Sequence, residues 1–198
     1  MHSKKLSLTL AAGGALETAL LPYYIVRLLT TTPLSVRVAL SQHALDFVTP
    51  TALQGLTGNL VYTEAMRFHP LSGRPMHLEF SDTDLLLVYP ATCRVIAEAS
   101  LGIISCPVTR TIAFSPKEKV VIVPYLNVAH HQLTYKEHLS RLTSQGCEVV
   151  VPLSEDLVWQ SESAWVAARH AVHNRLHLPT PNDTPVTWQA SSRDMDSC

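Results

Sequence analysis

The 198-residue chain carries 15 Lys and Arg against 16 Asp and Glu, and hydrophobic residues make up 46% of it. This length and composition suit one sizeable core, so we expect a single domain, and the absence of a basic run argues against nucleic-acid binding. Residues Met1 to Leu10 lack the long apolar core of a signal peptide or membrane span, which predicts a cytoplasmic protein without a membrane partner. Its 4 cysteines show no CxxC spacing, and its 10 histidines form no zinc-ligand pattern with them. We therefore expect reduced thiols and no metal.

Short apolar runs rich in Val, Ile and Leu predict strands that are buried on both faces. These runs are Leu6–Ala12, Leu34–Leu40, Asp84–Tyr89, Val120–Pro124 and Glu148–Pro152. Helical periodicity marks the stretches Leu16–Leu29, Pro50–Leu56, Arg94–Ile103, Thr134–Ser144 and Ser163–Leu176. The alternation predicts an α/β fold, a doubly wound parallel sheet with helices on both faces. Residues 178–198 are rich in Pro, Ser, Thr and Asp, which predicts a mobile tail after a domain that covers 1–177.

In such sheets ligands gather at the carboxyl ends of the strands. Gly13 and Gly14 follow the first strand and open a helix, where backbone N–H groups favour a phosphate, although a plain tight turn fits as well. Ser41 ends the second strand, either to donate to a phosphate or to cap a helix. The loop Tyr89–Arg94 offers a hydroxyl and several backbone donors. Together the three loops predict a mononucleotide site.

Two further side chains stand out near predicted strands. His77 lies between the polar excursion Arg67–Met76 and the third strand, where it is either a surface residue or a catalyst. Asn127 follows the strand Val120–Pro124, where its amide donates to a carboxylate or caps the next helix.

Five segments, in this order, resemble the homo-oligomeric flavin-containing cysteine decarboxylases, which include peptidyl-cysteine decarboxylases of lantibiotic biosynthesis and phosphopantothenoylcysteine decarboxylases. The segments are Gly13-Gly14, SQHALDFVTPTALQGLTGNLVYT, MHLEF, YPATCRVIAEASLGI and VPYLNV. The resemblance spans Leu6 to Pro152. It implies a Rossmann-like, flavodoxin-like domain that holds FMN between the subunits of a homotrimer or a dodecamer of trimers.

The resemblance also assigns roles to residues. It places the active-site histidine at His77, and at Asn127 the asparagine that binds the substrate carboxylate, preceded by Leu126 in place of the family's Met. It places the cofactor contacts at Gly13, Gly14, Ala15, Ser41, Phe47, Pro90, Ala91, Thr92 and Cys93. The chain departs from the family at Arg94, where an Asn is usual, and at Ser105-Cys106, where Asp-Asn is usual.

The implied reaction is the FMN-dependent oxidative decarboxylation of a C-terminal cysteine, in a ribosomally made precursor peptide, to an aminoenethiol. His77 would accept the thiol proton, because an unperturbed imidazole titrates near neutrality. The segment after Pro152 lacks the glycine-rich, cysteine-containing sequence of phosphopantothenoylcysteine decarboxylases, which favours the peptide-modifying branch. Three alternatives remain open: the coenzyme A branch, a flavin prenyltransferase, and a non-catalytic binding subunit.

Overall fold

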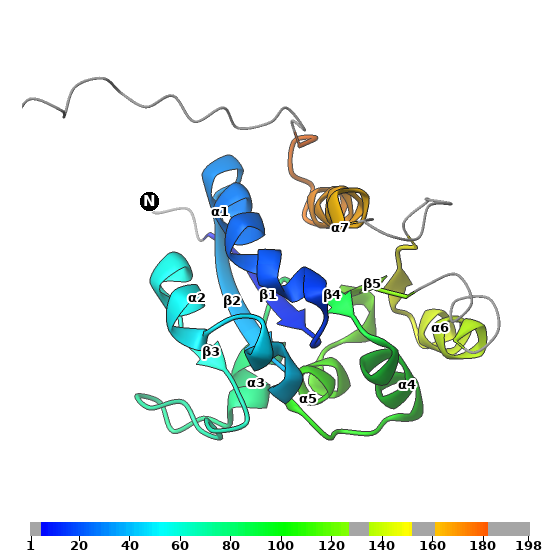
Figure 1. Ribbon diagram of the computed structural model, residues 1–198, viewed down its shortest axis with the longest axis horizontal. Helices are drawn as coiled ribbons and strands as arrows, with labels where there is room; N and C mark the ends of the chain where they lie inside the picture. The colour runs from blue at the N-terminus through cyan, green and yellow to red at the C-terminus, as the bar shows by residue number, and fades with distance from the viewer. Residues whose placement is uncertain (1–4, 127–134, 152–160, 182–198) are drawn as a thin grey trace, which may run out of the picture.

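The computed structural model describes residues 5–126, 135–151 and 161–181, with the side chains of 161–163 excepted. Its sheet has the strand order β3-β2-β1-β4-β5-β6, and every neighbouring pair of strands is parallel (Figure 1). The strands are β1 (Leu6–Ala12), β2 (Leu34–Leu40), β3 (Val61–Tyr62), β4 (Leu85–Ala91), β5 (Val120–Pro124) and β6 (Glu148–Val149). This is the strand order of a Rossmann-like doubly wound sheet, so the predicted fold class is confirmed.

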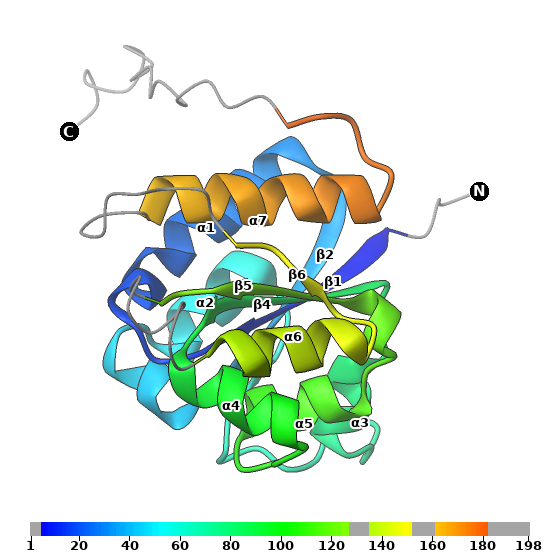
Figure 2. The ribbon, with the colours of Figure 1, turned by 90° about the vertical axis from the view of Figure 1, so that its right-hand side faces the viewer.

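Helices cover both faces of the sheet (Figure 2). On one face lie α1 (Leu21–Thr31), α2 (Pro50–Thr57) and α7 (Ser161–Arg175). On the other face lie α3 (Met76–Ser81), α4 (Cys93–Leu101), α5 (Pro107–Phe114) and α6 (Lys136–Ser144). The described residues also form three short 3-10 helices: η1 (Leu16–Leu20), η2 (Gln42–Asp46) and η3 (Lys117–Lys119).

Some elements differ from the sequence-based expectation. The predicted helix Leu16–Leu29 is divided into η1 and α1, because Pro22 stands in the first turn of α1, where its missing N–H costs nothing. The predicted strand Glu148–Pro152 is shorter, since only two of its residues pair with β5. The edge strand β3 and the helices α3 and α5 were not predicted. Each is short, and short elements give little periodicity.

Apolar side chains form one core cluster on each face of the sheet. Within the described ranges, no helix is long and apolar enough to cross a membrane, and no three His, Cys, Asp or Glu side chains gather as metal ligands. The predicted tail from residue 182 onward lies outside the described residues.

Helix α7 is held on the sheet by Trp165. Its ring is 2% exposed and stacks on Tyr24 of α1, with 4.4 Å between the ring centroids and 14° between the planes. It also meets Tyr89 of β4 at 5.7 Å.

Replacement of this ring should therefore be costly. We expect Trp165→Ala to lower the free energy of unfolding by about 3–5 kcal/mol, the usual cost of removing a buried aromatic side chain. Asn174→Ala, at an exposed position of the same helix, is the control and should change it by less than about 0.5 kcal/mol. Urea unfolding measures both, and equal midpoints for the two variants would contradict the packing described.

Candidate active site at the carboxyl end of the sheet

A cavity of about 500 Å³ opens at the carboxyl ends of β1, β2 and β4. The lining residues are Gly14, Ala15, Ser41, Gln42, His43, Glu64, Thr92, Cys93, Arg94, Val95, Glu98, Ser105, Cys106 and Tyr125. This volume is within the range of ligand and cofactor sites. A second cavity, of about 610 Å³, lies at the amino ends of the strands and contains none of the predicted site residues. The first cavity is therefore the candidate site.

The two glycines after β1 let the loops of this site come together. A Cβ on Gly14 would lie 2.5 Å from the Cβ of His43 and 2.6 Å from its backbone. A Cβ on Gly13 would lie 2.7 Å from a side-chain carbon of Thr92, and the Gly13 N–H donates to the Pro90 carbonyl at 3.0 Å. Because neither glycine has a side chain, the turn after β1 can lie directly against His43 and Thr92. These close contacts form one wall of the cavity.

Two hydroxyl groups at the cavity cap helices. Ser41 Oγ accepts from the Ala44 N–H at 3.3 Å at the start of η2, and Thr92 Oγ1 accepts from the Val95 N–H at 3.5 Å at the start of α4. Each hydroxyl keeps its own hydrogen for donation to a ligand. The amino end of α4 also favours negative charge. This side of the cavity suits a phosphate group.

An ion pair lines another wall of the cavity. Arg94 Nε donates to Glu98 Oε1 at 2.7 Å, and Ser105 donates to the other oxygen of that carboxylate. Arg94 Nη1 also lies 3.4 Å from Nε2 of His43, a residue of η2. The hydrogen bond with Glu98 and its negative charge raise the pKa of Arg94, so the guanidinium stays charged at this wall.

A second carboxylate, Glu64, is held from outside the cavity. Arg110 of α5 binds both of its oxygens, at 2.8 and 3.0 Å, and reaches Tyr62 Oη at 3.4 Å. The hydrogen bond with Glu64 is the largest cause that raises the pKa of Arg110. Since both cavity carboxylates are paired with arginines, neither leaves a bare negative charge facing a phosphate.

The structure brings together five of the predicted cofactor contacts: Gly14, Ala15, Ser41, Thr92 and Cys93. Three more do not line the cavity but lie beside it: Gly13 in the turn after β1, and Pro90 and Ala91 at the end of β4. Phe47 directly follows η2, is 39% exposed and does not line the cavity. Leu126 packs against the core on the α4 side.

The two predicted catalytic residues are placed differently. His77 is the second residue of α3 and does not line the cavity, and its ring lies 4.5 Å from that of Phe114, which is itself 49% exposed. Asn127 lies outside the described residues. In the described part of one chain, the half-buried side chain of His77, the proposed base, therefore does not line the cavity.

Several residues at the cavity were not predicted as site residues. His43, Glu64, Glu98 and Tyr125 had no role assigned, whereas Arg94, Ser105 and Cys106 were noted only as departures. The spacing of Arg94 and Glu98, four apart on a predicted helix, is a signal that could have revealed their ion pair.

The phosphate side of the cavity can be tested with FMN, the cofactor that the sequence resemblance implies. Thr92→Asp keeps a helix-capping oxygen but adds a negative charge beside Gly14 and Ser41. We expect it to weaken FMN binding at least about 100-fold, because like charges about 4 Å apart near a protein surface repel by about 4 kcal/mol. Thr49→Asp changes an equivalent cap, on α2 and away from the cavity, and should leave binding unchanged. Fluorescence titration measures the FMN affinity of both variants, and equal affinities would show that the phosphate does not bind at Thr92.

Comparisons with known proteins agree with this architecture. Residues 1–176 match the model of the family described as Flavoprotein. The coenzyme A biosynthesis bifunctional protein CoaBC of Haemophilus influenzae is 29% identical over 133 residues, which are 66% of this chain and 32% of that protein. The chain thus matches only a part of this relative.

Solved structures share the fold. The FMN-dependent cysteine decarboxylase SpaF aligns with a TM-score of 0.67 and 22% identity, covering 84% of this chain and 97% of SpaF. A PPC decarboxylase mutant aligns with a TM-score of 0.70 and 16% identity, covering 86% of this chain and 99% of that one. These findings confirm the resemblance seen in the sequence, and the chain belongs to the Flavoprotein family.

Proposed function

We propose that this chain is an FMN-dependent enzyme of the cytoplasm that oxidatively decarboxylates the C-terminal cysteine of a ribosomally made precursor peptide. The observation that carries the proposal is the cavity formed by the loops after β1, β2 and β4, with the hydroxyls of Ser41 and Thr92 on one side of it. Structures described as FMN-dependent cysteine decarboxylases, SpaF and TvaF from thioviridamide biosynthesis, support it through their common fold.

The donors of the cavity fit FMN. The backbone at Gly14 and Ala15, the hydroxyls of Ser41 and Thr92 and the amino end of α4 would hold the phosphate. The rest of the cavity, with Cys93 and Tyr125, leaves room for the ring system. The redox chemistry that FMN would supply there is the two-electron oxidation of the substrate cysteine.

His77 and Asn127 would act on the substrate. His77 would take the proton of the cysteine thiol, whose ordinary pKa is about 8.5, so that the thiolate can be oxidised. Asn127, next to Leu126, would donate its amide N–H to the carboxylate and hold it until CO₂ leaves. The product that remains is an aminoenethiol.

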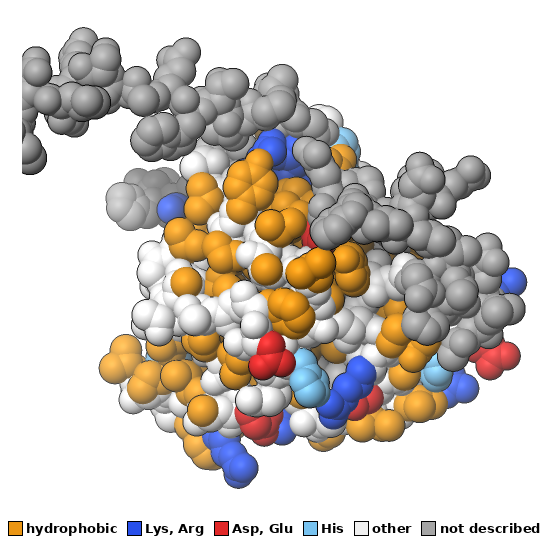
Figure 3. All heavy atoms as spheres, viewed as in Figure 1, with side chains coloured by type: hydrophobic (Ala, Val, Ile, Leu, Met, Phe, Trp, Pro, Cys, Tyr) orange, Lys and Arg blue, Asp and Glu red, His pale blue; other side chains and the backbone are white. Residues whose placement is uncertain are grey.

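The proposed site needs a second copy of the chain, because His77 lies outside the cavity of its own chain. Apolar residues are exposed along η1 and α1, where a broad hydrophobic area lies on the surface (Figure 3). Its members are Leu16, Leu20, Tyr23 and Val26, spaced as one face of a helix. Such exposed apolar surface favours assembly, in line with a homotrimer or a dodecamer of trimers.

One alternative is supported by a specific observation. The relative CoaBC is described as a coenzyme A biosynthesis protein, and the similarity of this chain to it favours phosphopantothenoylcysteine as substrate. The two functions differ in their products. The peptide reaction ends at the enethiol, whereas the coenzyme A pathway requires reduction to the saturated thiol.

A substrate comparison tests the proposed function. We expect the full chain to remove CO₂ and two hydrogens from a cysteine-ended peptide, detected by mass spectrometry, because the described cavity supplies a site for flavin redox chemistry. The same peptide ending in serine, which lacks the thiol, is the control and should stay unchanged. Conversion of phosphopantothenoylcysteine to a saturated product, with the peptide unchanged, would transfer the assignment to coenzyme A synthesis.

The roles of His77 and of the cavity can be separated by mutation. We expect His77→Asn to keep FMN but to lower kcat by roughly 10²–10⁴-fold, the usual loss when a positioned acid–base group is removed. Co-expression with Thr92→Asp should restore part of the activity. In mixed oligomers an intact cavity of one chain meets an intact His77 of another.

Native mass spectrometry establishes that mixed oligomers are present. The absence of restored activity in a preparation that contains them would mean that the histidine and the cavity of the same chain work together. Full activity of His77→Asn alone would remove the histidine from the mechanism.

A further inference from the structure

Glu17 is a buried carboxylate that the proposed function does not use. It lies in η1, is 2% exposed and does not line the cavity. Its Oε1 accepts two hydrogen bonds, from Tyr24 Oη at 2.6 Å and from Tyr89 Oη at 2.9 Å. A carboxylate is costly to bury, so its place between two tyrosines requires a physical reason.

The two tyrosines keep their hydrogens and act as donors. Burial, and after it the negative charge of Glu17, raises the pKa of Tyr89 far above its ordinary value. No ion pair of Glu17 with a basic side chain is found among residues 5–126, 135–151 and 164–181. Hydrogen bonds to a charged acceptor are about twice as strong as neutral ones, so Glu17 binds both rings firmly.

This arrangement joins η1, which follows the glycine turn after β1, to the last residues of β4. Glu17 follows Ala15 by two residues, and Tyr89 lies near the end of β4, three residues before Thr92. Beside this hydrogen bond, the Gly13 N–H meets the Pro90 carbonyl at 3.0 Å. Beyond the pairing of β1 with β4 in the sheet, two hydrogen bonds therefore join the segment after β1 to the end of β4.

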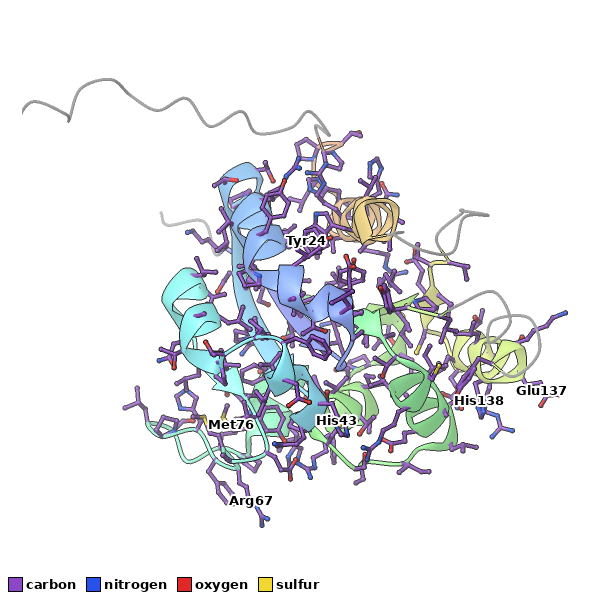
Figure 4. The ribbon with its side chains drawn as sticks, in the orientation of Figure 1. Tyr24, His43, Arg67, Met76, Glu137 and His138 are labelled. Atoms are coloured by element: carbon purple, nitrogen blue, oxygen red, sulfur yellow. The ribbon has the colours of Figure 1, made fainter. Side chains whose placement is uncertain are left out.

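Glu17 also lies close behind the cavity wall. Burial and then the charge of Glu17 raise the pKa of Tyr125, a residue that lines the cavity. Tyr24 and Tyr89 belong to the core of the α1 and α7 face, and Trp165 stacks on Tyr24. Figure 4 shows Tyr24 on this side and His43, at the cavity, on the other side of the sheet. Trp165 of α7 thus contacts Tyr24, and Tyr24 donates a hydrogen bond to Glu17, which lies behind the cavity wall.

We propose that Glu17 is a positioning residue for the cofactor: it holds the loops after β1 and β4 at the separation at which Gly14 and Thr92 bind the FMN phosphate. The inference rests on the proposed function in one respect, that FMN is the ligand of this cavity. It adds a buried anion, next to the core of the α1 and α7 face of the sheet, as a determinant of cofactor affinity.

The test measures how tightly the full chain binds FMN. Glu17→Gln keeps the shape of the side chain and removes its charge, and Tyr89→Phe removes one donor. We expect each to raise the FMN dissociation constant at least about tenfold, as followed by flavin fluorescence on dilution at a temperature where circular dichroism shows the fold intact. The effects of the double variant should be less than the sum of the two single effects, because Glu17→Gln weakens, by removing the acceptor's charge, the same hydrogen bond that Tyr89→Phe removes.

Glu137→Gln, at an exposed position of α6, is the matched control and should bind FMN as the wild type does. If Glu17→Gln does not fold, Tyr89→Phe alone decides, since it leaves Glu17 its bond from Tyr24. Lowered thermal stability with unchanged FMN affinity would overturn the inference and leave the proposed function standing. Failure of the wild type to bind FMN would instead overturn the proposed function, and the inference with it.

Discussion

The close approach of the loops after β1, β2 and β4 is the constraint on which the rest of the site depends. Gly14 lies so close to the backbone of His43 that a side chain at position 14 would not fit. The Gly13 N–H donates a hydrogen bond to the Pro90 carbonyl. The strand order reverses between β1 and β4, and at this switch point the crossovers lie on opposite faces and leave a crevice. The cavity therefore follows from topology, and the glycines make its walls continuous.

The two faces of the sheet have different tasks. The α4 side carries the cavity with its helix terminus, capping hydroxyls and paired carboxylates. The α1 and α7 side carries a compact aromatic cluster around Glu17 that fixes the ends of β1 and β4 from behind. The hydrogen bonds that Glu17 accepts from Tyr24 and Tyr89 would be lost in any other arrangement of these segments, so they favour one geometry of the ends of β1 and β4.

Much of the fold could be predicted from the sequence, because long apolar runs such as Leu34–Leu40 can only be buried strands here. Gly14, Ser41 and Thr92 were predicted as cofactor contacts because each lies within three residues of the end of such a run, and the structure places all three at the cavity. The contacts of Glu64 with Arg110, 46 residues apart, and of Glu17 with Tyr89, 72 apart, could not be predicted. They depend on tertiary packing that leaves no local pattern, as does the position of His77 outside the cavity.

The central claim is that the loops after β1, β2 and β4 hold the phosphate of FMN. A crystal structure of the full chain grown with FMN tests it most directly. The account predicts the phosphate against the backbone of Gly14 and the hydroxyls of Ser41 and Thr92, with His77 of a neighbouring copy turned toward the cofactor. FMN bound elsewhere, or a cavity that excludes it in crystals saturated with the cofactor, would contradict the account.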